Sequence, residues 1–483
     1  MRWRYILYTE GALLFFFGLT MLLPIGFSFF YQDAGVRPLL YSLAATLGAG
    51  LVLMLLFRGP GVAAIGQEEG MAIVALGWTA VGFFGALPFF LAGDHWSVVD
   101  AVFESVSGFS TTGASILDDI EALPPGLLLW RSLIQWLGGM GIIVLSIAIL
   151  PFLGVGGMQL YKAEVPTPVP DKLKPRIRDT AKILWQVYAL FTALEVVLLM
   201  FGGLTFFDAL CHAFTTLPTG GFSIWNRSVA HFDSLYIELV ILFFMVLAGI
   251  NFSLHYQMLR GRPLAFWRDG ECRFFLAIVA VLVLVVSADL HAAAVFRHAG
   301  EALRHGAFQV VSIVTTTGFA TADYQQWPAM SQLILLACMF LGGCAGSTAG
   351  GMKILRVIIC IKFCYKELFS LVHPRAVTTI KLGGRTVPPD VIRSVLGFLA
   401  LYISLFALTT IVLAGLGVDF VTAIGAVAAT IGNIGPGFGL VGPVENYAQI
   451  PFLGKWLLIW CMLLGRLEIY TLLILLVPEF WRK

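Results

Sequence analysis

Apolar runs recur along the whole chain and are separated by short polar or glycine-rich connections. A helix of roughly 20 apolar residues is long enough to cross a ~30 Å hydrocarbon layer. The first run, from Ile6 to Phe30, is too long for a secretory signal and lacks a small-residue cleavage site, so we expect a retained span. A second run at 38–57 pairs with it, and four further pairs follow. The pattern predicts an all-α polytopic membrane protein with ten spans.

A short apolar segment lies between the two spans of each of the four later pairs, and each segment ends in a glycine-centred polar turn. The four turns are centred on Gly113, Gly220, Gly318 and Gly435. A helix of about ten residues reaches only the membrane midplane, so the chain must return as non-helical backbone. Such backbone is tolerated at that depth only where it is buried in protein or lines a water-filled cavity. Four pseudo-symmetric repeats around one pore would surround it with carbonyl oxygens, which can replace the hydration shell of a cation.

The residue types at these turns suit a cation filter. Glycine adopts backbone conformations closed to other residues, and threonine hydroxyls can hold the turn or face an ion. We expect Asp100 and Asp208 to cap the short helices, whose negative ends then point toward the pore. Thr-Thr-Gly alone is common in loops, but four segments in register favour a shared pore. The candidate filter residues are Thr111, Thr112, Gly113, Thr219, Gly220, Thr316, Thr317, Gly318, Asn433, Ile434 and Gly435.

The second span of the third repeat is interrupted at 342–352, where five of eleven residues are glycine. A helix so rich in glycine is not expected to stay regular. Arg466 lies within the otherwise apolar last span, where a charge is costly and needs a partner. Residues two apart on a helix point to different faces, so loop carbonyls at 346–350 suit Arg466 better than Glu468 does. Close helix packing through small residues and a purely structural ion pair are the alternatives.

Composition supports a lipid environment, because 59% of the 483 residues are hydrophobic and 12% are charged. Basic connections at 162–182, 260–273 and 353–393 alternate with acidic ones, which predicts cytoplasmic termini by the positive-inside rule. The basic residues are dispersed and the formal net charge is +2, which argues against nucleic-acid binding. Seven cysteines without CxxC spacing and eight scattered histidines predict neither a disulfide framework nor a zinc site. No catalytic constellation is visible, so we do not expect an enzyme.

Several motifs together are similar to those of a known family. They are Ser-Thr-Thr-Gly113-Ala, Pro-Thr-Gly220-Gly-Phe-Ser, Thr-Thr-Thr-Gly318-Phe, Ala-Thr-Ile-Gly-Asn-Ile-Gly435-Pro-Gly, Gly-Gly-Cys-Ala-Gly346-Ser-Thr-Ala-Gly350-Gly-Met-Lys353 and Leu-Gly-Arg466-Leu-Glu468-Ile-Tyr. Over essentially its whole length the chain resembles the Trk/Ktr/HKT superfamily of potassium transporters. The extra N-terminal pair of spans favours the bacterial TrkH type over the shorter Ktr-type subunits.

The resemblance implies potassium uptake across the bacterial inner (plasma) membrane, with one selectivity filter per chain. It implies a homodimer in membrane lipid, with two separate pores and a TrkA-like cytosolic regulatory ring. A nucleotide, NAD or ATP/ADP, would bind only to that partner, and potassium would be the substrate of a chain that has no cofactor. Some sodium-preferring plant relatives carry serine at the first filter position, so Gly113 favours potassium. A sodium-permeable protein or an ion-coupled secondary cation transporter is the alternative.

In the family, the stretch that matches 342–352 is an intramembrane loop that blocks the closed pore. The candidate gate residues are Gly346, Ser347, Thr348, Gly350, Lys353 and Arg466. We expect the basic stretches at 172–182 and 362–385 to dock an acidic or nucleotide-bound partner, with membrane-surface contact as the alternative. The expected units are an N-terminal helix pair at 1–65 and pore repeats at 66–165, 166–265, 266–380 and 381–483.

Overall fold

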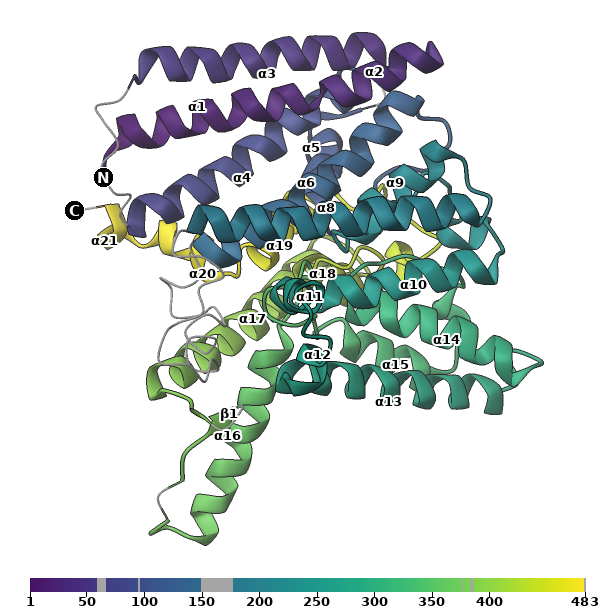
Figure 1. The fold of residues 1–483 in the computed structure, drawn as a ribbon, viewed down its shortest axis with the longest axis vertical. Coiled ribbons are helices and arrows are strands. Elements are labelled where there is room, and N and C mark those ends of the chain that lie inside the picture. Colours follow the sequence, from purple (N-terminus) through teal and green to yellow (C-terminus); the bar gives the residue numbers. More distant parts are fainter. Residues whose placement is uncertain (59–66, 94–95, 149–176, 377, 383–384, 482–483) are drawn as a thin grey trace.

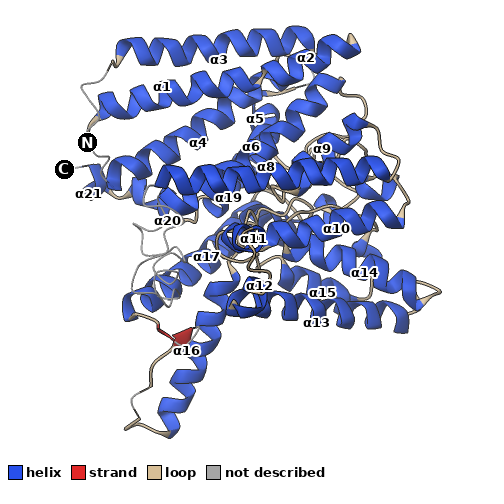
Figure 2. Ribbon diagram, in the orientation of Figure 1, coloured by secondary structure: helices blue, strands red, loops and turns tan. Residues whose placement is uncertain are grey.

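The computed structural model describes residues 1–58, 67–93, 96–148, 177–376, 378–382 and 385–481. Helices and loops dominate these residues, as the helical pattern predicts (Figure 2). The strand structure in this part of the chain is one antiparallel hairpin of β1 (Lys381–Leu382) and β2 (Arg385–Thr386). The N-terminal helices lie along one edge of the molecule, and the far end of α16 projects from the opposite edge (Figure 1). The fold is the predicted helical membrane type.

The N-terminal pair consists of α1 (Trp3–Thr20), which α2 (Leu22–Tyr31) continues, and α3 (Val36–Leu56). These bounds confirm the two predicted spans. Glycines let the helices approach closely, because a Cβ built on Gly11 would lie 2.8 Å from the carbonyl oxygen of Gly50. Small residues at such a crossing are typical of helix packing in membranes.

Four units follow, and in each a helix of 11–16 residues precedes the predicted turn. The first contains α4 (Gln67–Phe90), α5 (Val98–Phe109) and α6 (Pro125–Ala148); the second contains α8 (Ile177–Phe201), α9 (Phe206–Thr216), η2 (Ser228–His231), α10 (Leu235–Gly249) and α11 (Phe252–Leu259). After α12 (Ala265–Arg268), the third contains α13 (Gly270–Ala292), α14 (Ala299–Val314), η3 (Tyr324–Gln326), α15 (Ala329–Cys338) and α16 (Ile354–Val372). The fourth contains α17 (Pro389–Gly415), α18 (Phe420–Ile431), η4 (Gly439–Val441), α19 (Phe452–Arg466), α20 (Tyr470–Leu473), η5 (Ile474–Leu476) and α21 (Pro478–Trp481). The expected boundary at 265/266 falls within α12.

Six helices in the described part of the chain are long and apolar enough to cross a membrane, and eight spans result if each bent pair counts as one. The bends are 104° between α10 and α11 and 112° between α19 and the segment that begins with α20. The other two of the ten predicted spans correspond to α6 and to α15 with α16, which a loop interrupts. Breaks in the second span therefore occur in the second, third and fourth units.

The short helices begin with hydroxyl caps in the first two units, which corrects the expectation that Asp100 and Asp208 are the caps. Ser97 and Thr205 cap α5 and α9, and their hydroxyls accept the N–H groups of Asp100 (3.2 Å) and Asp208 (3.1 Å). Each aspartate is the third helical residue, and its carboxylate accepts a hydrogen bond from the hydroxyl of the capping residue. Both carboxylates remain at the positive end of a helix, where they are favourable.

An aspartate does cap the short helix of the fourth unit. The carboxylate of Asp419 accepts the N–H groups of Val421 and Thr422, both at 3.1 Å. Hydrogen bonds from the side chain and backbone of Thr422 hold the pKa of this exposed carboxyl below its ordinary value. The cap therefore stays negatively charged at neutral pH.

Candidate functional site

The four predicted turns follow the same backbone path. A non-glycine residue with positive φ starts each turn: Thr111 (51°), Thr219 (57°), Thr316 (58°) and Asn433 (54°). A glycine with positive φ stands two residues later: Gly113 (81°), Gly221 (71°), Gly318 (87°) and Gly435 (99°). Positive φ is costly for residues with a Cβ, so its recurrence at matching positions marks a common structure.

The glycine of the second repeat that matches the others is Gly221, one residue after the predicted Gly220. Backbone hydrogen bonds fix this register, because each turn donates an N–H group to a carbonyl five residues earlier. The pairs are Thr112 to Ser107 (2.9 Å), Gly220 to Thr215 (2.8 Å), Thr317 to Ser312 (2.8 Å) and Ile434 to Ala429 (2.9 Å). Gly220 therefore belongs with Thr112, Thr317 and Ile434. Sequence reasoning missed Gly221, and the only signal for it was the Gly-Gly pair itself.

The four turns close a ring. A Cβ built on Gly113 would lie 2.0 Å from the carbonyl oxygen of Gly220 in the next repeat. The same construction on Gly221 meets Thr317 O at 1.9 Å, on Gly318 meets Ile434 O at 1.9 Å, and on Gly435 meets Thr112 O at 2.8 Å. Each repeat thus contacts the next, and the fourth contacts the first. The four segments surround a single axis, and each matching glycine lies against a neighbouring carbonyl group.

Side chains tie this ring together from outside. The polar side chains of Thr111, Thr112, Thr219, Thr316, Thr317 and Asn433 are fully buried. The amide of Asn433 donates to Thr112 Oγ1 (3.0 Å) and to Met462 O (2.9 Å), so it joins the fourth repeat to the first. The hydroxyl of Tyr447 donates to Gly435 O at 2.7 Å. These side-chain hydrogen bonds link the fourth repeat to the first and anchor the turn at Gly435.

An ion pair behind the ring holds the chain where it leaves the first two turns. Glu104 in α5 is fully buried, and its Oε1 lies 2.6 Å from Nε of Arg131 in α6. The same carboxylate accepts the N–H of Ile116 (3.1 Å), while Arg131 Nη1 donates to Ser223 O (2.7 Å). The pair therefore links the segment after Gly113 to the segment after Gly221.

The interrupted stretch of the third repeat forms an irregular loop at 339–353, directly beside the ring. The N–H of Gly350 donates to the hydroxyl of Thr316, a ring residue, at 2.6 Å. The hydroxyl of Thr348 donates to Leu217 O (2.9 Å) and Ala248 O (3.2 Å), both in the second repeat. Because the non-helical turn of the third repeat starts at Thr316, the loop lies at the end of the ring where the short helices stop.

Two basic side chains bond to this loop: Arg466 of the fourth repeat and Lys353 of the loop itself. Arg466 Nη1 donates to Thr348 O at 2.7 Å, and its Nη2 donates to Gly138 O at 3.4 Å. The predicted loop-carbonyl partner of Arg466 is therefore confirmed, while Glu468 pairs with Arg356 instead. Lys353 donates to Ala349 O within the loop.

The remaining candidate gate residues also belong to this arrangement. The carbonyl of Gly346 accepts the N–H of Phe252 at 3.1 Å, and the Ser347 hydroxyl donates to Cys344 O at 2.6 Å. All six candidate gate residues thus lie on the loop or contact it.

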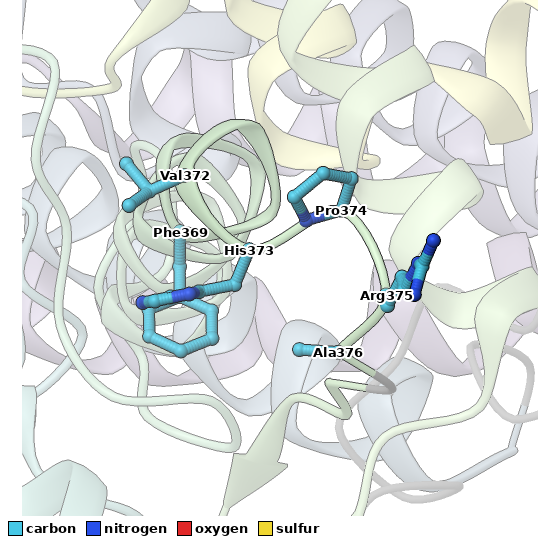
Figure 3. Close-up of a pocket in the computed structure, with 6 residues that line it drawn as sticks. All are labelled: Phe369, Val372, His373, Pro374, Arg375 and Ala376. Atoms are coloured by element: carbon cyan, nitrogen blue, oxygen red, sulfur yellow. The ribbon is translucent and has the colours of Figure 1, made fainter.

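A surface pocket lies away from these residues, at the end of α16. It is lined by Phe369, Val372, His373, Pro374, Arg375 and Ala376 (Figure 3). None of the candidate filter or gate residues lines it. We therefore assign the candidate site to the ring and its loop.

Comparison with known proteins identifies the architecture. A family model described as TrkH, cation transport protein, matches residues 45–483. The chain belongs to the TrkH family. The Trk system potassium uptake proteins TrkH of Halomonas elongata and of Escherichia coli K12 are 43% and 42% identical to it, and each match covers at least 99% of both chains. The crystal structure of the potassium transporter TrkH from Vibrio parahaemolyticus matches with a TM-score of 0.92, at 40% identity and full coverage of both chains. This TrkH-family chain is a membrane transport protein and not an enzyme, as predicted.

Proposed function

We propose that this chain takes up potassium through the ring formed by the four turns. The observation that carries the proposal is the closed order of contacts, in which each matching glycine faces a carbonyl group of the next repeat. Carbonyl oxygens around one axis can replace the hydration shell of a monovalent cation. The relatives named as potassium uptake proteins support potassium as that cation.

The loop at 339–353 acts in this proposal as the gate. It bonds to the inner end of the ring through Thr316 and to Arg466, so it obstructs the path below the filter when it is held there. Glycine-rich backbone can change conformation at low cost. A TrkA-like cytosolic regulatory partner that binds NAD or ATP/ADP would shift the loop between its closed and open conformations, while the chain itself binds no cofactor.

We propose a homodimer in the bacterial inner membrane, with both termini in the cytoplasm. The far half of α16 supports a second copy, because Tyr365 (70%), Leu368 (65%) and Val372 (73%) are exposed there. Lys362 lies in the same stretch, which argues that lipid tails do not cover these apolar side chains. The basic stretch at 362–385 remains a candidate docking site for the partner; in the other stretch, at 172–182, residues 172–176 lie outside the described residues.

The test is ion flux through the purified protein in liposomes with defined gradients. We expect uptake of potassium and rubidium to exceed uptake of sodium, with no requirement for a proton or sodium gradient. Empty liposomes and a detergent-solubilised helical protein of similar size provide the background. Equal permeability to sodium would favour the sodium-permeable alternative, and flux that requires a second ion gradient would favour a coupled transporter.

The buried pair of Glu104 and Arg131 gives a prediction about filter geometry. Glu104→Gln leaves Arg131 as an uncompensated buried charge, which costs about 3–5 kcal/mol in proteins. We expect a lower thermal unfolding temperature and a reduced preference for potassium over sodium, because the segments after Gly113 and Gly221 lose their common anchor. Thermal unfolding in detergent and reversal potentials measure the two effects. Asp390→Asn, at an exposed ion pair with Arg393, is the matched control and should change neither.

A further inference from the structure

An acidic residue, Glu271, contacts the gate loop, which is the loop at 339–353. Glu271 lies in the first turn of α13 and is 8% exposed. Its Oε1 accepts the N–H of Ala345 at 2.7 Å and the N–H of Leu355 at 3.1 Å. Ala345 lies in the loop before Thr348, and Leu355 lies after the loop, in the first turn of α16. A single carboxylate oxygen therefore joins both sides of the loop at its base.

Backbone hydrogen bonds also hold this part of the loop, including that from the N–H of Cys344 to Gly249 O at 2.8 Å. The N–H of Ile354 donates to Gly343 O at 3.1 Å, and that of Met352 donates to Phe340 O at 3.4 Å. Backbone N–H groups that no helix or sheet satisfies need partners at this depth. Hydrogen bonds to a charged acceptor are stronger than those to a neutral one. Glu271 is therefore well placed to decide whether the base stays closed.

The connection between Phe252 and Glu271 contacts the loop at both of its own ends, because Phe252 also bonds to the loop. At the start of α11, the N–H of Phe252 donates to Gly346 O at 3.1 Å. Between Phe252 and Glu271 the chain forms α11 and α12 and exposes Arg260, Arg262 and Arg268, together with Trp267 (65%). The connection thus holds neighbouring loop residues, Ala345 and Gly346, from its two ends. A displacement of this exposed segment would reach the loop through both contacts.

We propose that Glu271 is a positioning residue that acts as a latch, because its two hydrogen bonds hold the base of the gate loop closed. Movement of the connection formed by α11 and α12 releases the loop. This inference rests on the proposed gating function of the loop. Closed, the carboxylate holds Ala345 and Leu355 together, and Arg466 holds the apex at Thr348. Loss of either support shifts the loop toward the open arrangement, with the ring itself unchanged.

The experiment measures rubidium uptake into potassium-loaded liposomes by the full-length protein without any partner. We expect Glu271→Ala to raise basal uptake about tenfold, and Glu271→Gln to raise it less, because the amide oxygen still accepts a hydrogen bond. Asp269→Asn is the matched control: Asp269 caps α13 through Cys272 N (2.7 Å), asparagine caps equally well, and uptake should stay within about twofold of wild type. The potassium preference should persist in every variant.

A second readout separates latching from general loosening of the fold. Cys344 lies in the loop and is 1% exposed, and Cys461 in α19 is 2% exposed. We expect both Glu271 variants to increase maleimide labelling of Cys344, measured by peptide mass spectrometry, with Cys461 unchanged. Equal increases at both cysteines would overturn the proposal, because they would indicate a loosened fold. If the alanine variant does not fold, the isosteric glutamine variant carries the test.

Arg466→Ala in the same assay distinguishes this inference from the proposed gate. Increased uptake in Arg466→Ala with unchanged uptake and labelling in both Glu271 variants would overturn the latch and leave the gate standing. Unchanged uptake in all three folded variants would overturn both, because the loop would then not obstruct the pore.

Discussion

Gly221→Ala is expected to lower the ratio of potassium to sodium permeability by at least about tenfold, whereas Gly220→Ala should have a much smaller effect. A Cβ on Gly221 would lie 1.9 Å from Thr317 O, and the residue has φ of 71°, which costs roughly 1–2 kcal/mol with a side chain present. The backbone carbonyl of the next repeat must therefore move. At Gly220, a Cβ would instead meet the end of the Gln135 side chain at 2.3 Å. A shift of that side chain would weaken its hydrogen bond to Gly220 O (2.8 Å) but would not push a carbonyl group of the ring directly, so we expect the smaller effect.

Reversal potentials of the two purified variants in liposomes with opposed potassium and sodium gradients measure this difference. The pair is well matched, because the two glycines are adjacent and receive the same side chain. Thermal unfolding identifies any variant that fails to fold. A larger loss of selectivity in Gly220→Ala than in Gly221→Ala would contradict the register of the second repeat.

The space available for an added Cβ differs among the four glycines of the ring. Symmetry of the sequence alone predicts equal sensitivity to substitution at all four turns. The nearest carbonyl oxygen would lie 1.9–2.0 Å from a Cβ on Gly113, Gly221 or Gly318, but 2.8 Å from one on Gly435. Substitution at Gly435 should therefore be tolerated best, because Thr112 O needs to move least.

The sequence predicted the helical membrane fold because hydrophobic periodicity and length determine which segments cross a membrane. It located four turns because each combines a short apolar segment with glycine, and it found the loop partner of Arg466 because the cost of a buried charge restricts its choices. Each of these signals is local or rests on simple energetics.

What the sequence did not predict depends on geometry between distant segments. Two adjacent glycines, Gly220 and Gly221, cannot be told apart until backbone hydrogen bonds fix the register. Ser97 precedes Asp100 by three residues, and either side chain can cap a helix, so only the observed helix start decides. The contact of Glu271 with Leu355 spans 84 positions, and no local pattern indicates it.

Arg466→Ala is expected to raise potassium flux through the isolated protein about tenfold or more. The guanidinium is 2% exposed and donates to Thr348 O and Gly138 O, so it connects the loop apex to the first repeat. Hydrogen bonds to charged groups contribute about 1.5–3 kcal/mol each, and a few kcal/mol is enough to change a mostly closed population into a mostly open one. The removal of Arg466 leaves Glu468 paired with Arg356, so the substitution does not create an unpaired buried carboxylate.

Two variants serve as controls for this leak, one at Lys455 on the same helix and one at position 466 itself. Lys455→Ala removes a cation from the opposite end of α19, where Lys455 pairs with Asp100 at 2.6 Å and does not contact the loop, so basal flux should not rise. Arg466→Lys retains the charge but loses the forked donors, and it should leak less than alanine. Because Arg466 bonds to the carbonyl of Thr348 in the loop, and the loop meets the ring through the bond from Gly350 N–H to the Thr316 hydroxyl, the leak should keep the wild-type preference for potassium. A leak that also loses selectivity would place Arg466 in the support of the filter, and wild-type flux in a folded Arg466→Ala protein would mean that the loop only packs helices together.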